Sequence, residues 1–190
     1  MKELRILSPT AILGYGFPLS SFEAGMAKNP DVIAVDGGST DPGPYYLGSG
    51  KSFTDRTAVK RDLEIMIKAA LSHNIPVIVG SAGGSGAKSH LDWCADIVRD
   101  IAKEGHLTFK LALIEADIHK DLVLHKLEEG HITPLYPAKQ LEAYDILKTT
   151  NVVAQMGIEP MVEALNNGAQ VILAGRAYDP TSFAALAAKE

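Results

Sequence analysis

Six short hydrophobic runs alternate along the chain with segments whose hydrophobic residues recur at helical spacing. Each run is apolar on successive residues, which is typical of parallel strands that are buried on both faces. We therefore expect six strands, at residues 4–7, 32–35, 77–79, 111–114, 152–154 and 171–174.

Two of the intervening segments predict helices most clearly. The first begins at Asp55 and ends at the tripeptide 74–76, because a residue that precedes proline is pushed away from helical geometry. The second begins at Ser89, which has the spacing of a capping box with Asp92, and ends at Gly105. Weaker helical patterns lie at residues 119–129, 140–148, 159–167 and 180–188.

The alternation of strand and helix predicts an α/β fold with a mainly parallel sheet of about six βα units. The pattern leaves open whether this sheet is doubly wound (Rossmann-like) or curls into a partial barrel. We expect residues 1–190 to form a single α/β domain. Because the sequence ends on a helical segment without a tail, we also expect it to be the amino-terminal part of a longer protein.

The composition and charge of the chain exclude several classes of binding partner and site. The net charge of −5 argues against nucleic acid, which would call for a basic face. No apolar run approaches the ~20 residues of a membrane span, and no secretion signal is visible, so we expect no membrane partner and a cytoplasmic protein. Cys94 is the one cysteine and lies on the apolar face of its helix, which excludes an intramolecular disulfide and predicts a core position. His119 and His125 fall on different helix faces, so we expect solvated side chains and no histidine-based metal site.

Polar residues and glycines collect directly after the predicted strands. Parallel α/β folds bind their ligands at the carboxyl ends of the strands, whether the sheet is open or closed. We therefore expect a site at this edge, built from Asp36 to Asp41, Gly80 to Gly86, Glu115 with Asp117, Gln155, and Gly175 with Arg176 and Asp179.

Three well-known motifs are excluded by their spacing. The tripeptide 50–52 reads GKS, but the first glycine of a P-loop would fall on Tyr45, and no predicted strand leads into it. Leu19 and Ser89 stand where a dinucleotide-binding fingerprint needs its third glycine. No serine has the G-x-S-x-G context of a nucleophile elbow, so serine-hydrolase chemistry has no support.

The loop after the second predicted strand offers two acids and two hydroxyls. Asp36 and Asp41 could act as general acid or base or bind a divalent metal, with Ser39 and Thr40 as hydrogen-bonding partners. The alternative is that these side chains only form Asx-type turns and helix caps.

The glycine-rich turn after the third predicted strand has two interpretations as well. Gly83, Gly84 and Gly86 let backbone N–H groups approach a phosphate or carboxylate, next to the positive end of a helix dipole. The alternative is a tight turn from strand to helix.

Basic side chains lie at positions where they could bind an anion. Arg56, Lys60 and Arg61 lie in the first turns of a helix, where the dipole disfavours cations, so either a bound anion or nearby aspartates offset them. Arg176 and Asp179 could clamp a carboxylate or form a structural ion pair.

Asp117 follows a strand and stands two residues before His119, so the two could act together. Tyr46 could shield a ligand or pack the loop. The remaining candidate ligand-binding residues are Gly37, Gly38, Gly43, Lys51, Ser81, Glu115, Gln155 and Gly175.

Several segments in order along nearly the whole chain resemble the acyclic terpene utilisation AtuA family. They are DGGSTDPGPYYLGSGKSFTDRTAVKRDL, IPVIVGSAGGSG, DIVRDIA, FKLALIEADIHKD and VVAQMGIEPMVEALNNGAQVILAGRAYDPTSFAAL. Gly37 and Tyr178 depart from the usual family pattern, which often has a small residue such as Ala at the first position and reads GRASD around the second. Family members are longer than this chain.

The resemblance implies a role in the breakdown of citronellol- and geraniol-like terpenes as coenzyme A thioesters, for which a hydratase-type step has been suggested. Relatives also occur in anaerobes that degrade amino acids. We therefore expect a lyase of hydratase type that acts on a small carboxylate or acyl-CoA, with coenzyme A as part of the substrate and no required cofactor. The alternative is a non-catalytic binding or assembly subunit that recognises the same ligand for a partner enzyme. The remainder of a longer protein and a homo-oligomer are further partners that the sequence leaves open.

Overall fold

Five parallel strands form one open sheet in the computed structural model, which describes residues 3–38 and 44–190. The strands are β1 (Ile6–Leu7), β2 (Val32–Asp36), β3 (Val77–Gly80), β4 (Leu111–Ile114) and β5 (Val171–Ala174). Their order across the sheet is β1-β2-β3-β5-β4, and every pairing is parallel. The predicted mainly parallel α/β fold is confirmed.

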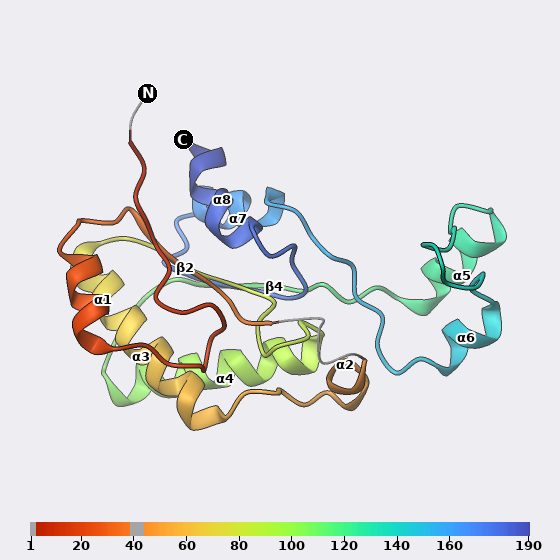
Figure 1. Cartoon of the computed structure of the whole chain (residues 1–190), viewed down its shortest axis with the longest axis horizontal. Helices are drawn as coiled ribbons and strands as arrows, with labels where there is room; N and C mark the ends of the chain where they lie inside the picture. The colour runs from red at the N-terminus through yellow and green to blue at the C-terminus, as the bar shows by residue number, and fades with distance from the viewer. Residues whose placement is uncertain (1–2, 39–43) are drawn as a thin grey trace.

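Helices cover both faces of the sheet (Figure 1). One face packs against α1 (Leu19–Met26), α3 (Arg56–His73) and α4 (Lys88–Glu104), and the other against α7 (Glu159–Asn166) and α8 (Thr181–Lys189). The chain advances across the sheet from β1 to β4 and then turns back to β5. Because crossovers of one hand change face when their direction reverses, the last helices lie opposite the first ones. The sheet is therefore doubly wound, which decides against the partial barrel.

Successive residues of the strands point to opposite faces of the sheet. Ile33 and Val35 of β2 enter the cluster under α1, α3 and α4, whereas Val32 and Ala34 enter the cluster under α7 and α8. All four side chains are fully buried. Burial on both faces explains why the central strands β2, β3 and β5 read as continuous apolar runs.

The strand predicted at residues 152–154 is wrong. Val153 makes only an isolated antiparallel bridge with Asp117, beside the bonds from Ile118 N to Val152 O and from Ala154 N to Ala116 O. The apolar run pairs with the segment that follows β4 because both lie at the base of a projection from the sheet. Tertiary position overrides the local pattern here.

The strongly predicted helices form with the expected ends, with one exception. Asp55 caps α3 by accepting bonds from two backbone N–H groups, and Asn74 ends it in the left-handed conformation. The capping box predicted at Ser89 is wrong, because α4 begins at Lys88 with Ala87 as N-cap, and the carboxylate of Asp92 binds Lys88 Nζ instead. Gly105 ends α4 as predicted.

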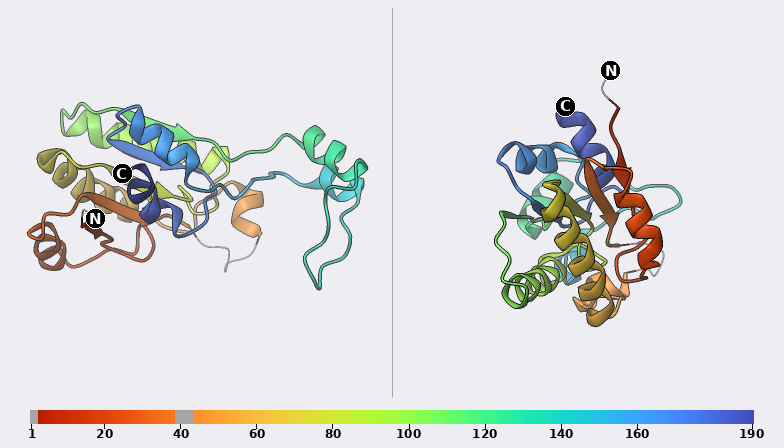
Figure 2. Two further views of the ribbon diagram at one scale, coloured as in Figure 1. Left: turned by 90° about the horizontal axis from the view of Figure 1, so that it is seen from above. Right: turned by 90° about the vertical axis from the view of Figure 1, so that its left-hand side faces the viewer.

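A projection that we call the arm (residues 118–151) extends away from the sheet (Figures 1 and 2). It contains α5 (Lys120–Glu128) and α6 (Ala143–Lys148), both predicted. Ile146 is its one buried residue, whereas Leu135 and Tyr136 are 87% and 94% exposed. At its base, Asn151 Nδ2 donates to Leu47 O in the short helix α2 (Tyr45–Ser49). In the part of the chain that the structure describes, no helix has the length and apolar character that crossing a membrane requires.

Candidate functional site

The carboxyl ends of the strands bring three buried polar residues to one edge of the sheet: Asp36 as the last residue of β2, Ser81 after β3 and Arg176 after β5. Their backbones are tied together, since Ser81 N donates to Gly175 O at 3.1 Å and Arg176 N donates to Gly86 O at 3.0 Å. Glu115, after β4, lies at the same edge but is exposed. The prediction that these residues share one edge is confirmed.

Asp36 is the buried acid of this edge, with 8% of its surface exposed. Its register partner is Gly80, and by alternation from Ala34 its side chain lies on the face that α8 covers. Burial raises the pKa of the carboxyl from 3.8 to about 6; the backbone N–H of Gly38 and the charge of Arg176 oppose the rise, whereas Asp179 adds to it. At neutral pH the group therefore exchanges protons readily, as a general acid or base must.

Arg176 places a cation beside this acid. Its Nε donates to Ser85 O at 3.3 Å and its Nη2 to Gly84 O at 3.0 Å. Burial lowers the pKa of the guanidinium, while the charges of Asp36 and Asp179 raise it. Among the described residues no carboxylate oxygen lies within 4 Å of the guanidinium, so the structural ion pair, one of the two alternatives for Arg176 and Asp179, does not form in this arrangement. The clamp on a carboxylate stays a prediction.

The glycines at this edge allow the backbones of the segments after β2, β3 and β5 to pack closely against one another. A Cβ on Gly38 would lie 1.9 Å from Gly84 O, and one on Gly86 would lie 2.2 Å from Arg176 N. Gly86 also has a φ of +71°, which other residues rarely adopt. Comparable clashes would occur at Gly37, Gly83, Gly84 and Gly175. Internal packing accounts for these glycines, and their role in docking an anion stays a prediction.

Ser182, in the first turn of α8, belongs to the same edge and was not predicted from sequence. It is 1% exposed, and its Oγ is buried without a hydrogen-bond partner in the described part of the chain. Oγ and Asp36 Oδ1 each lie 3.6 Å from the position that a Cβ on Gly80 would take. A hydroxyl in the first turn of a helix that follows a strand end is the signal that could have found it.

The basic start of α3 is offset by carboxylates of the protein itself. Arg56 pairs with Asp100 at 2.9 Å, and Lys60 pairs with Glu104 at 2.6 Å. Arg61 Nη1 pairs with the carboxylate of Asp62 at 2.9 Å, and Arg61 Nη2 donates to Phe17 O. The partners of Arg56 and Lys60 lie on α4, 44 residues away. These ion pairs offset the basic side chains, and substrate binding by Lys60 and Arg61 stays a prediction.

The other predicted residues at this edge are exposed or form ion pairs within the protein. Glu115 pairs with Lys88 at 3.2 Å, and Asp117 and Gln155 are exposed near the base of the arm. The exposed His119 precedes α5 as its N-cap residue and makes no side-chain cap bond. In the part of the chain that the structure describes, no hydrogen bond or ion pair joins it to Asp117.

His90, a residue that sequence reasoning missed, is 1% exposed, and its Nε2 binds the carbonyls of Tyr46 and Lys51 at 3.0 and 3.1 Å. It therefore ties these two predicted binding residues to α4. Burial lowers the pKa of its imidazole. Tyr46 also packs its ring on Phe53, in keeping with the packing alternative.

Asp41, Ser39, Thr40 and Gly43 lie outside the described residues, so the three alternatives for Asp36 and Asp41 stay open: proton transfer, a divalent metal, or turns of the loop. Cys94 is fully buried in the core as predicted, and burial raises the pKa of its thiol to about 12.

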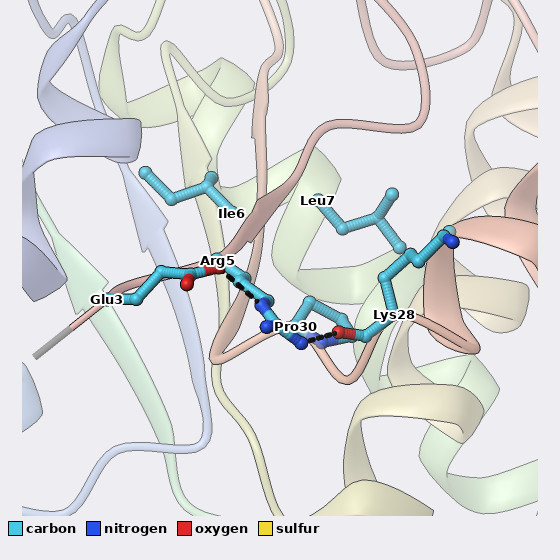
Figure 3. A pocket seen from close by; sticks show the side chains of 7 residues that line it. Glu3, Arg5, Ile6, Leu7, Lys28 and Pro30 are labelled. Atoms are coloured by element: carbon cyan, nitrogen blue, oxygen red, sulfur yellow. Dashed lines mark hydrogen bonds and ion pairs between the residues drawn. The ribbon is translucent and has the colours of Figure 1, made fainter.

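A cavity of about 560 Å³ lies away from this edge, at the amino end of β1 (Figure 3). Its lining includes Arg5, which is held by Glu3 Oε1 at 2.8 Å and by Lys28 O at 2.7 Å. Because the lining residues precede β1 and β2 or belong to them, the cavity is separate from the carboxyl-edge cluster.

Comparison with known protein families shows which family the chain belongs to. Residues 49–190 match the sequence model described as acyclic terpene utilisation family protein AtuA. The chain belongs to the AtuA family. The matched range includes Ser81, Arg176 and Ser182, whereas Asp36 precedes it. No curated protein and no solved structure matches the chain.

Proposed function

We propose that this AtuA-family chain is an enzyme of lyase type that adds water to, or removes it from, a small carboxylate or acyl-CoA. The observation that carries the proposal is the buried Asp36, with a pKa raised to about 6, beside the cationic Arg176 at the ligand-binding edge of an α/β sheet. The family supports a setting in terpene utilisation.

In the hydration direction the carboxylate of Asp36 takes a proton from a water molecule. The water oxygen forms a C–O bond at the carbon β to the substrate carbonyl, and the electron pair of the double bond moves toward the carbonyl oxygen. Arg176 stabilises that negative charge. Protonation of the α carbon by Asp36 completes the addition and restores the carboxylate, so one water is consumed and nothing else changes.

An assembly or binding subunit that recognises the same ligand remains the second candidate, and the arm favours it. Leu135 and Tyr136 expose nearly their whole side chains, and Tyr144 and Leu147 are 60% and 61% exposed. Apolar surface of this kind marks sites of protein association. In this alternative the edge binds a carboxylate or acyl-CoA without converting it.

The test is turnover by the full chain on the α,β-unsaturated counterparts of isovaleryl-CoA and methylsuccinate, followed by mass spectrometry with and without Mg²⁺. We expect Asp36→Asn to abolish hydration of the unsaturated thioester while binding persists, and the exposed Asp96→Asn to leave turnover unchanged. Binding by the unvaried chain without any turnover would establish the second candidate instead. Turnover that survives Asp36→Asn would refute the assigned role of this acid.

A further inference from the structure

We propose that Ser182, at the amino end of α8, donates a hydrogen bond to an oxygen of the bound carboxylate or thioester, next to Asp36. The inference deepens the proposed function and rests on it for the identity of the ligand. It gives the edge a second group for recognising oxygen, besides the guanidinium of Arg176.

The position of α8 makes its first turn part of the site. The helix packs over β2 and β3 on the face that carries Asp36 and Gly80. Its N-cap residue is Pro180, which supplies no side-chain cap, and its first turn contains no acidic residue. The first N–H groups of a helix lack intrahelical acceptors and carry a partial positive charge, so this end favours an anionic oxygen.

The unpaired hydroxyl is the observation that points to a ligand. Nearly all buried polar groups in folded proteins have a hydrogen-bond partner, and burying one without a partner destabilises the fold. Ser182 Oγ is the one side-chain atom of this kind in the described residues. Thr181, the preceding residue, bonds its hydroxyl to Tyr178 O, so the local backbone can satisfy such a group. Ser182 is left unpaired where it approaches Asp36.

Gly80 keeps the approach between the two groups open. A Cβ built on it would lie 3.6 Å from Asp36 Oδ1 and 3.6 Å from both Ser182 Cβ and Ser182 Oγ, which are ordinary contacts. Alanine therefore fits at this position without a clash, yet its methyl would contact both the acid and the hydroxyl. Gly80→Ala tests the space, and Ser182→Ala tests the donor.

The experiment compares Ser182→Ala, Gly80→Ala and a matched control, Ser20→Ala, in the full chain. Ser20 is the second residue of α1, as Ser182 is of α8, and it also follows a proline N-cap, but it is exposed. Isothermal titration with methylsuccinate and isovaleryl-CoA measures binding, and thermal unfolding without a ligand measures stability.

We expect Ser182→Ala to weaken binding of at least one probe by about tenfold to a hundredfold, as loss of a bond to a charged or polarised oxygen does. Without a ligand, the same variant should unfold about 2 °C or more above the control, because an unpaired buried hydroxyl has been removed. Gly80→Ala should weaken binding with the fold retained. A hydroxyl with a purely structural role would give the opposite shift in unfolding temperature.

Three results would overturn the inference: unchanged affinity in Ser182→Ala, unchanged affinity in Gly80→Ala, or no binding of either probe by the unvaried chain. Its failure is distinguishable from failure of the proposed function. Turnover that depends on Asp36 but not on Ser182 would refute only the inference, whereas binding that depends on Ser182 without turnover would refute only the enzymatic assignment.

Discussion

Replacing Asp36 with asparagine should make the protein more stable at neutral pH. The native carboxyl has a pKa of about 6 and the ordinary value is 3.8, so folding takes up a proton between these two pH values. Stability linked to this group therefore falls as pH rises from about 4 to about 6.5 and stays low above that. About two pKa units correspond to about 3 kcal/mol, which screening at the sheet edge reduces to about 2 kcal/mol.

Asparagine keeps the oxygen that accepts the 3.3 Å bond from Gly38 N and removes the charge that burial opposes. Urea unfolding of both proteins at pH 4.5, 5.5, 6.5 and 7.5 measures the difference in unfolding free energy, in which the other titrating groups cancel. We expect Asp36→Asn to be about 2 kcal/mol more stable at pH 7.5 and the advantage to shrink toward pH 4.5. A variant that is less stable at pH 7.5 would show that attraction to Arg176 outweighs burial, and a difference independent of pH would show that the two offset each other.

Three further outcomes follow from the described contacts. Cys94 should not react with a thiol reagent in the native protein at pH 8 and should react fully in urea, because burial raises its pKa to about 12. Gly38→Ala should lower the unfolding free energy by more than ~3 kcal/mol in urea titrations, since its Cβ would overlap Gly84 O. As a control, Gly130→Ala should lower it by only ~1 kcal/mol, because its Cβ meets no atom within 4 Å and only the positive φ disfavours it. His90→Ala should speed amide exchange across residues 45–51 while the central strands stay protected, because the imidazole binds two carbonyls there.

The sequence predicted most of the sheet because its strands read as apolar runs, and the central strands β2, β3 and β5 are buried on both faces. The same signal failed at Val153, where a similar run pairs with the base of the arm instead of the sheet. The helix α1 was missed because only Phe22 and Met26 of its eight residues are buried, which leaves a short and weak stripe.

The site was predictable where topology alone places residues together. Asp36 and Arg176 follow strands, and parallel strands share a carboxyl edge, so no knowledge of packing was needed. The ion pair of Lys60 was not predictable, because its partner, Glu104, lies on another helix and spacing cannot reveal such a pair. Ser182 had no motif, and its importance depends on a missing hydrogen-bond partner, which only coordinates can show.

The arm leaves the sheet and returns to it at the same point, because Ile118 N bonds to Val152 O and Asp117 faces Val153 across the bridge. Paired residues of this kind have Cα atoms about 5 Å apart, a gap that one or two residues span. The arm is thus a modular insertion in the crossover between β4 and α7. Because both ends of the arm lie at one point, its length does not determine where the acid, the guanidinium and the hydroxyl lie at the sheet edge.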